Sequence, residues 1–228
     1  MNTKIMALTI ATTAFSLALN AQTKNTTVAT SDQSITFGIR AGVNFTNING
    51  QQYDNSDFHG KLKTGFNVGV NAEIPLATDF YVQPGILFTT KGAKNKDNDK
   101  IKYSISYLEI PINFLYKPEL GDGKLLLGVG PYVAFGVGGK LTNSSGKDMD
   151  FKFKNSISAS EYLTDPYLKR IDFGGNLLAG YELSSRLSAQ LNAQLGLIKI
   201  NPKIEGVTND HTKLKNTGFG ISLGYRFM

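Results

Sequence analysis

The chain of 228 residues contains no cysteine and no tryptophan, and it has only two histidines. Without cysteine the protein has no disulfide framework, no thiolate metal site and no cysteine nucleophile. The formal net charge of +6 is modest, and no basic stripe is interleaved with aromatic residues, so nucleic-acid binding has little support. No phosphate-binding glycine loop, zinc spacing or EF-hand pattern is present, and we expect no cofactor.

Long apolar runs are also missing after the N-terminus, where no stretch approaches the roughly 18 apolar residues of a transmembrane helix. Residues 1–21 combine a basic start at Lys4, the apolar run IMALTIATTAFSLAL and the small residue Ala21. This pattern is typical of a cleaved signal peptide, and the run is short for a membrane anchor. We therefore expect an exported protein with a flexible periplasmic arm at residues 22–34, and its main domain at 35–228.

Apolar residues alternate with a period of two from residue 35 onward, which indicates strands. Eight such runs follow one another, and each has one face that carries no charge. In YLEIPINFLYKP (107–118), the even-numbered residues from 108 to 116 are apolar, whereas Glu109 and Asn113 fall on the other face. Because Pro111 has no N–H to donate to a strand ladder, we expect a bulge or local irregularity there.

The connections between these runs alternate strictly between long and short. The long connections are 46–62, 91–101, 139–168 and 200–214, and the short ones are 77–79, 117–123 and 184–185. Such alternation with an even number of strands is typical of outer-membrane barrels, which have short periplasmic turns and long outer loops. The sequence therefore predicts an all-β fold, an eight-stranded antiparallel up-and-down transmembrane β-barrel in the cell outer membrane. A soluble lipocalin-like carrier is the alternative.

Charges within the strands lie on the faces opposite the apolar ones, together with many glycines. The interior of an eight-stranded barrel is narrow enough for side chains to fill, and buried charges there must pair. We expect a lumen polar network that holds the barrel shut, in preference to a proton or solute path. Its expected members are Arg40, Glu73, Glu109, Asp172, Glu182, Arg186 and Arg226, with Arg170 as a further base. Of these, Glu182, Arg186 and Arg226 are expected to meet at the short-turn end.

Aromatic residues cluster near both ends of the apolar faces, as the interfacial girdles of membrane barrels do. At the short-turn end the expected girdle consists of Phe80, Tyr116, Tyr181, Tyr225 and Phe227. At the long-loop end it consists of Phe45, Phe66, Phe88, Phe135, Phe173 and Phe219. The general preference of aromatic residues for strands does not predict two bands. We therefore expect both bands to contact outer-membrane lipid.

The long loops are the best candidates for function, because loops on a rigid scaffold commonly carry binding. The segment MDFKFK (149–154) is expected to extend a strand or to form a hairpin. The charge run KGAKNKDNDK (91–100) is expected to be solvated, with contact to anionic lipid headgroups as an alternative. We expect a non-enzymatic role in envelope structure or in binding, with a protein partner as one candidate ligand of the loops.

Catalysis and metal binding have weak support, since both histidines fall in long loops. His211 with Asp210 and Ser144 would make the Ser/His/acid set of a lipid-modifying barrel enzyme, but nothing in the spacing requires it. His59 and two nearby aspartates would make a metal site, for which a hydrated acidic loop is the ordinary alternative.

Three stretches, YLEIPINFLYKP, GVGPYVAFGVGG and FGIRAGVNFTN, resemble the outer-membrane β-barrel family common in Bacteroidota, which includes PorT-like proteins. SLALNAQ is similar to signal-peptide ends in that group. The resemblance implies an eight-stranded outer-membrane barrel, and its PorT branch implies an accessory role in type IX secretion and gliding as an alternative function. The terminal GISLGYRFM resembles the strand read by the barrel-insertion machinery, except that Met228 follows the aromatic Phe227.

Overall fold

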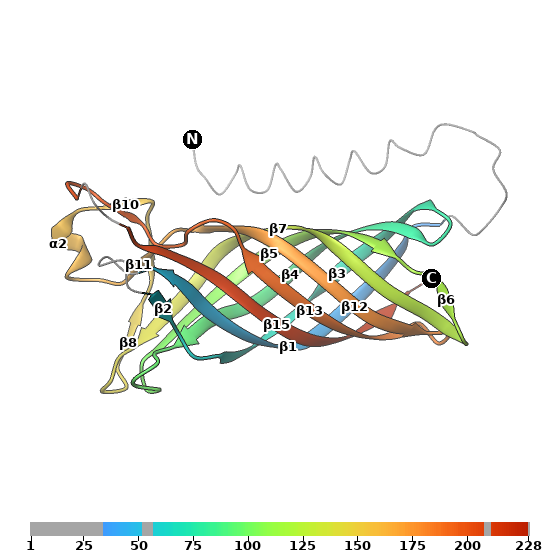
Figure 1. The fold of residues 1–228 in the computed structure, drawn as a ribbon, viewed down its shortest axis with the longest axis horizontal. Coiled ribbons are helices and arrows are strands. Elements are labelled where there is room, and N and C mark those ends of the chain that lie inside the picture. The colour runs from blue at the N-terminus through green and yellow to red at the C-terminus, as the bar shows by residue number, and fades with distance from the viewer. Residues whose placement is uncertain (1–33, 52–56, 208–210, 228) are drawn as a thin grey trace. The chain divides into compact units, whose positions relative to one another are not determined.

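The computed structural model describes residues 34–51, 57–207 and 211–227. The expected signal peptide and nearly all of the expected periplasmic arm lie outside these residues. Eight long strands form the domain (Figure 1): β1 (Thr36–Gln51), β3 (Lys63–Ala77), β4 (Phe80–Lys94), β5 (Lys102–Tyr116), β7 (Gly123–Thr142), β12 (Ile171–Leu183), β13 (Leu187–Gly196) and β15 (Lys213–Arg226). Each is antiparallel to its neighbours, and β1 pairs with β15 to close the ring. The predicted eight-stranded barrel is confirmed.

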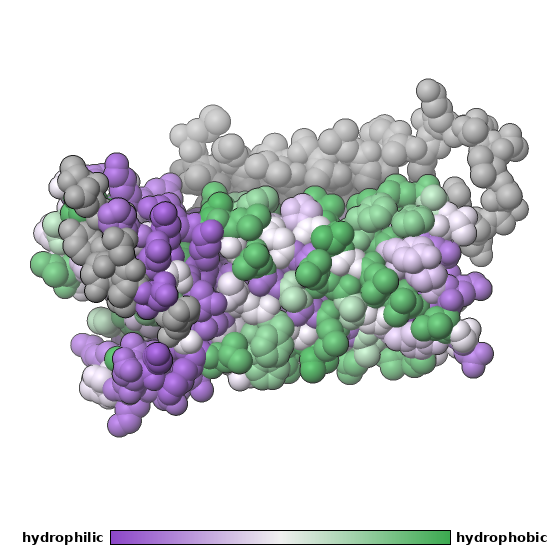
Figure 2. Space-filling model, in the orientation of Figure 1, coloured by the Kyte–Doolittle hydropathy of each residue, from purple (hydrophilic) through white to green (hydrophobic). Residues whose placement is uncertain are grey.

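Burial alternates along the strands as the sequence predicts. On β5, Leu108 and Phe114 are 40% and 45% exposed, whereas Glu109 and Asn113 are each 2% exposed. On the face drawn in Figure 2, apolar side chains cover much of the barrel wall and hydrophilic ones gather at the loop end. Hydrocarbon offers no hydrogen-bond partners, and a closed ring satisfies its main-chain groups internally. The wall therefore has the construction that a membrane requires.

The strands run further into the predicted long loops than the sequence pattern indicates. β1 continues to Gln51 and β7 to Thr142, so parts of the predicted loops 46–62 and 139–168 are strand. Apolar alternation ends there because the extensions no longer have one face toward lipid. The ladder continues nevertheless, since main-chain pairing does not depend on that alternation.

Short elements gather at the long-loop end (Figure 1): β2 (Asp57–His59), β8 (Asp148–Asp150), β9 (Lys152–Phe153), β10 (Ser156–Ile157), α2 (Ala159–Tyr162), β11 (Tyr167–Leu168) and β14 (Lys203–Ile204). β8 pairs antiparallel with β7, so MDFKFK begins a hairpin, which is one of its two predicted forms. β9 pairs with β11, and β10 with β14. We call residues 143–170 and 197–207 the loop cap. At the opposite end, β6 (Glu119–Leu120) pairs with β7.

None of the helices in the described part of the chain is long and apolar enough to cross a membrane.

The only irregularity expected within a strand, at Pro111, takes the form of a gap in pairing. On the β4 side the pairing passes over Ile110 and Pro111 without a change in register. The shift in register between β5 and β7 lies elsewhere, between Ser106 and Tyr107.

Candidate functional site: the lumen and the loop cap

Two acids and two bases fill the lumen at the short-turn end. Lys117 Nζ lies 2.7 Å from Glu73 Oε2 and 3.0 Å from Glu182 Oε1. Arg226 Nε lies 3.2 Å from Glu182 Oε2, and its Nη2 contacts Glu73 Oε1. All four residues are buried, and each carboxylate has two cations beside it. This short-turn cluster is therefore neutral, which is what burial of four charges requires.

A second cluster lies nearer the loop end. Lys91 Nζ is 2.7 Å from Glu109 Oε2 and 3.7 Å from Asp172 Oδ2. The same ammonium lies 4.1 Å from the centroid of the Tyr132 ring, a distance at which the ring face attracts a cation. Gln194 donates a hydrogen bond of 2.6 Å to Glu109 Oε1. We call Lys91, Glu109, Asp172 and Tyr132 the central cluster; all four are buried.

The structure places the three other predicted bases differently. Arg40 lines a small lumen cavity that Glu109 also lines, but it forms no ion pair among the described residues. Arg186 lies in the turn after β12 with a φ of 69°, and its side chain joins neither cluster in the part of the chain described. The structure thus brings Glu182 and Arg226 together without Arg186. Arg170 is exposed before β12, over the ring of Phe153.

Sequence reasoning left Lys91 and Lys117 out of the network. It counted Lys91 among the charges on the inward strand faces, at the edge of a long loop, but did not pair it, and it assigned Lys117 to a short turn. Both side chains are buried in the lumen clusters. The available signal was charge balance. Four inward acids need four inward bases, and Arg186 in a turn cannot supply one of them.

All five girdle residues at the short-turn end lie on the outer side of the barrel. Phe80 and Tyr116 stack with their ring centroids 4.9 Å apart, and Tyr225 meets Phe227 edge to face at 5.5 Å. All four rings are exposed. Tyr181 is only partly exposed, because its hydroxyl donates a 2.7 Å hydrogen bond to a carbonyl in the turn between β5 and β7.

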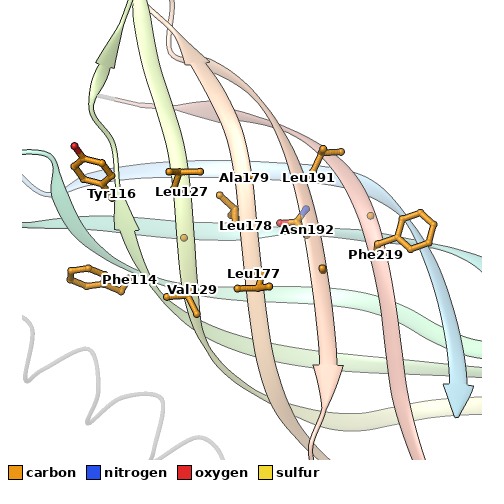
Figure 3. Close-up of a pocket in the computed structure, with 13 residues that line it drawn as sticks. Phe114, Tyr116, Leu127, Val129, Leu177, Leu178, Ala179, Leu191, Asn192 and Phe219 are labelled. Atoms are coloured by element: carbon orange, nitrogen blue, oxygen red, sulfur yellow. The ribbon is translucent and has the colours of Figure 1, made fainter.

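Ring pairs also occur toward the loop end, where Phe45 lies 5.4 Å from Phe219 and Phe66 lies 5.8 Å from Phe88. Between the two bands the outer wall has a hollow of about 660 Å³, drawn in Figure 3. Small residues of β7, β12, β13 and β15 line its floor, and leucine, valine and aromatic side chains surround it. No charged residue lines this hollow, so acyl chains of the bilayer can fill it.

An apolar core seals the mouth of the barrel. Phe151, Leu168 and Ile200 of the loop cap are buried against Ile48 and Ile105 of the strands. Ile48, Phe151, Leu168 and Ile200 also line a cavity of about 750 Å³ between the cap and the strand ends. Sequence analysis missed this core, because it treated the loops as solvated and its apolar residues are scattered among charged ones.

The proposed catalytic and metal sets each include an aspartate, Asp210 or Asp54, that lies outside the described residues. His211 is exposed. Among the described residues, no group of three or more histidine, aspartate or glutamate side chains is placed to hold a metal ion.

Comparison with curated proteins finds no match. Among solved structures, Ail of Yersinia pestis in complex with the heparin analogue sucrose octasulfate is 14% identical, with 85% of this chain and 99% of that chain covered and a TM-score of 0.41. Neisserial surface protein A is 11% identical, with 85% and 99% covered and a TM-score of 0.47. A major outer membrane protein from Thermus thermophilus is 16% identical, with 85% and 100% covered and a TM-score of 0.47. Residues 20–201 match the family described as outer membrane protein beta-barrel domain, so this chain belongs to that family and its barrel lies in the outer membrane.

Proposed function

We propose that this protein is a non-enzymatic outer-membrane barrel, closed to solutes, that serves as a binding platform at its loop end. The supporting observation is how its charge is partitioned. Four acids and four bases lie in the lumen, where they balance. The described loop end, at 57–63, 94–102, 140–170 and 197–215, carries sixteen Lys and Arg against eight Asp and Glu.

Closure of the lumen follows from its contents. The central and short-turn clusters occupy two levels, and a buried apolar group of Leu115, Leu126 and Leu178 lies inside the same wall. The cavity beside Arg40 has a volume of only about 30 Å³, which is room for roughly one water molecule. Cavities of this size do not form a continuous path for ions through the described part of the lumen.

The loop end has the features of a binding platform. Ion pairs of Lys152 with Asp165 and of Lys154 with Glu161 brace the cap. On this braced cap, Tyr162 and Leu163 are 62% and 84% exposed, although they lie beyond the lipid-facing wall. Large apolar side chains presented to water on a rigid support commonly mark an interaction site.

Conductance measurement tests closure. We expect the purified protein, inserted in a planar bilayer, to show no steady conductance step. Heat-modifiable migration on a gel, run on the same preparation, establishes that the barrel is folded. A stable step on the nanosiemens scale would show an open lumen and would overturn the proposal.

Affinity capture from intact envelopes tests the platform. We expect an envelope component to co-purify with the protein, and to be lost when cap residues 143–168 are replaced by a short glycine–serine linker. The matched control replaces residues 95–101, a loop at the same end but outside the cap, and should retain the component.

The identity of the captured component separates the finer alternatives. Components of a type IX secretion apparatus would favour the accessory role, and capture that survives loss of the cap would contradict the platform. A change in envelope lipids that disappears with His211→Ala would contradict the non-enzymatic role.

A further inference from the structure

The cavity under the loop cap is a built site with a mainly apolar lining. Phe58 and Leu214 line it from the strand side, and Ile157 and Leu168 from the cap. Its volume of about 750 Å³ lies within the 300–1,000 Å³ typical of small-molecule sites. It is thus too large for ordered water alone and too apolar for a sugar or an ion.

Three phenol groups, those of Tyr103, Tyr162 and Tyr167, supply much of the polar part of this lining. Tyr103 comes from the loop end of β5 and Tyr162 from the last residue of α2, and both line the cavity. Burial raises the pKa of Tyr103 above its ordinary value, and the neighbouring phenol of Tyr162 raises it further. Each phenol hydroxyl can donate or accept a hydrogen bond.

Charge is almost absent from the cavity lining. Asp165 is the only charged residue there among those described, and Lys152 Nζ neutralises it at 2.5 Å. The amide of Asn201 is engaged with main-chain groups of Thr212 and Leu214. An ionised ligand would find no free counter-charge among the described lining residues, whereas a neutral hydroxyl or carbonyl would find phenol hydroxyls.

We propose that this cavity binds a neutral, mainly apolar small molecule, such as a medium-chain alcohol or ketone, whose one polar group bonds to Tyr103 and Tyr162. This site deepens the proposed binding platform and rests on it. The capping box of Ser158 and Glu161 fixes the start of α2, so Tyr162 is held in place before a ligand arrives.

Because the natural sequence contains no tryptophan, the fluorescence of one introduced tryptophan reports on its position alone. Phe58→Trp places a single tryptophan in the cavity lining, and Phe114→Trp places one on the lipid-facing wall as the matched control. The probe is 10-bromodecan-1-ol, whose bromine quenches tryptophan fluorescence on contact. We expect saturable quenching of Phe58→Trp, reversed by unbrominated decan-1-ol. Phe114→Trp should show only linear quenching from partition into the micelle, which the competitor does not reverse.

The role of the phenols is tested in the Phe58→Trp background. There 10-bromodecan-1-ol should bind more tightly than 1-bromodecane, by about 2- to 12-fold for each neutral hydrogen bond that its hydroxyl makes. Adding Tyr103→Phe and Tyr162→Phe together should remove this preference while leaving quenching by 1-bromodecane unchanged. Heat-modifiable migration verifies that each variant is folded.

Three results would overturn the inference. They are linear quenching at both tryptophans, equal binding of the two probes to the protein with both tyrosines, and protection of the cavity tryptophan by a captured protein that the probe cannot displace. None of these would affect the closed lumen or the cap as a platform. Conversely, a conducting pore would contradict the proposed function and leave a saturable cavity intact.

Discussion

Lys117→Met is expected to lower the free energy of unfolding by about 3–5 kcal/mol, because removal of one partner leaves buried charge uncompensated. The side chain of Lys117 is 3% exposed and lies between Glu73 and Glu182. After the substitution, two buried carboxylates would share the single cation of Arg226. Urea unfolding in detergent micelles, followed by the heat-modifiable band on a gel, measures the change.

Two comparisons isolate the cause of this loss. Adding Glu182→Gln to Lys117→Met restores neutrality in the short-turn cluster and should recover a large part of the stability. Lys140→Met removes the same side chain from an exposed pair, in which Nζ lies 3.3 Å from Asp148, and should cost less than about 1 kcal/mol. Equal losses in the two single variants would show that the lumen charges are not buried as described.

Leu191→Arg is expected to destabilise the barrel by about 2–4 kcal/mol in a lipid bilayer, the cost of a basic residue at mid-depth on the lipid face. Leu191 points outward from the middle of β13, where it pairs with Ala179 and Ile221. Unfolding in phospholipid vesicles measures this change.

The control for Leu191→Arg is the same substitution at a position away from the middle of the bilayer. Leu183→Arg introduces the same group at the end of β12, close to the short turns, where the cost should fall to about 0–1 kcal/mol. A soluble barrel would tolerate both substitutions within about 0.5 kcal/mol. Two small and equal effects would therefore contradict the lipid-facing wall.

Much of the membrane-embedded fold is predictable, because lipid imposes a strict pattern on each strand. Leu108 and Phe114 had to face hydrocarbon, so Glu109 and Asn113 had to face the lumen, and the structure has this arrangement. The count of alternating runs gave the number of strands, and the alternation of long and short connections indicated an up-and-down barrel. The exact strand ends were not predictable, because the pattern disappears where β1 and β7 leave the lipid.

Residues of the candidate site were harder to predict, because they depend on contacts between distant strands. Lys117 follows its strand directly, and only the closed ring brings it against Glu182, 65 residues later in the chain. The buried core of the cap has no periodicity, since Phe151, Leu168 and Ile200 come from separate segments and only Leu168 lies in a strand. Arg186 was misplaced because it lies in the connection between β12 and β13, with a φ of 69°, so that strand alternation does not apply to it.

The surplus of basic residues at the loop end also fixes the orientation of the folded protein in the membrane. If the folded protein turned over, these lysines and arginines would have to leave water together with the cap, and each charge at mid-bilayer costs at least about 2.5 kcal/mol. Sixteen such residues present a barrier far beyond thermal energy. The orientation adopted at assembly is therefore permanent, and the cavity under the cap always lies on the same side of the membrane.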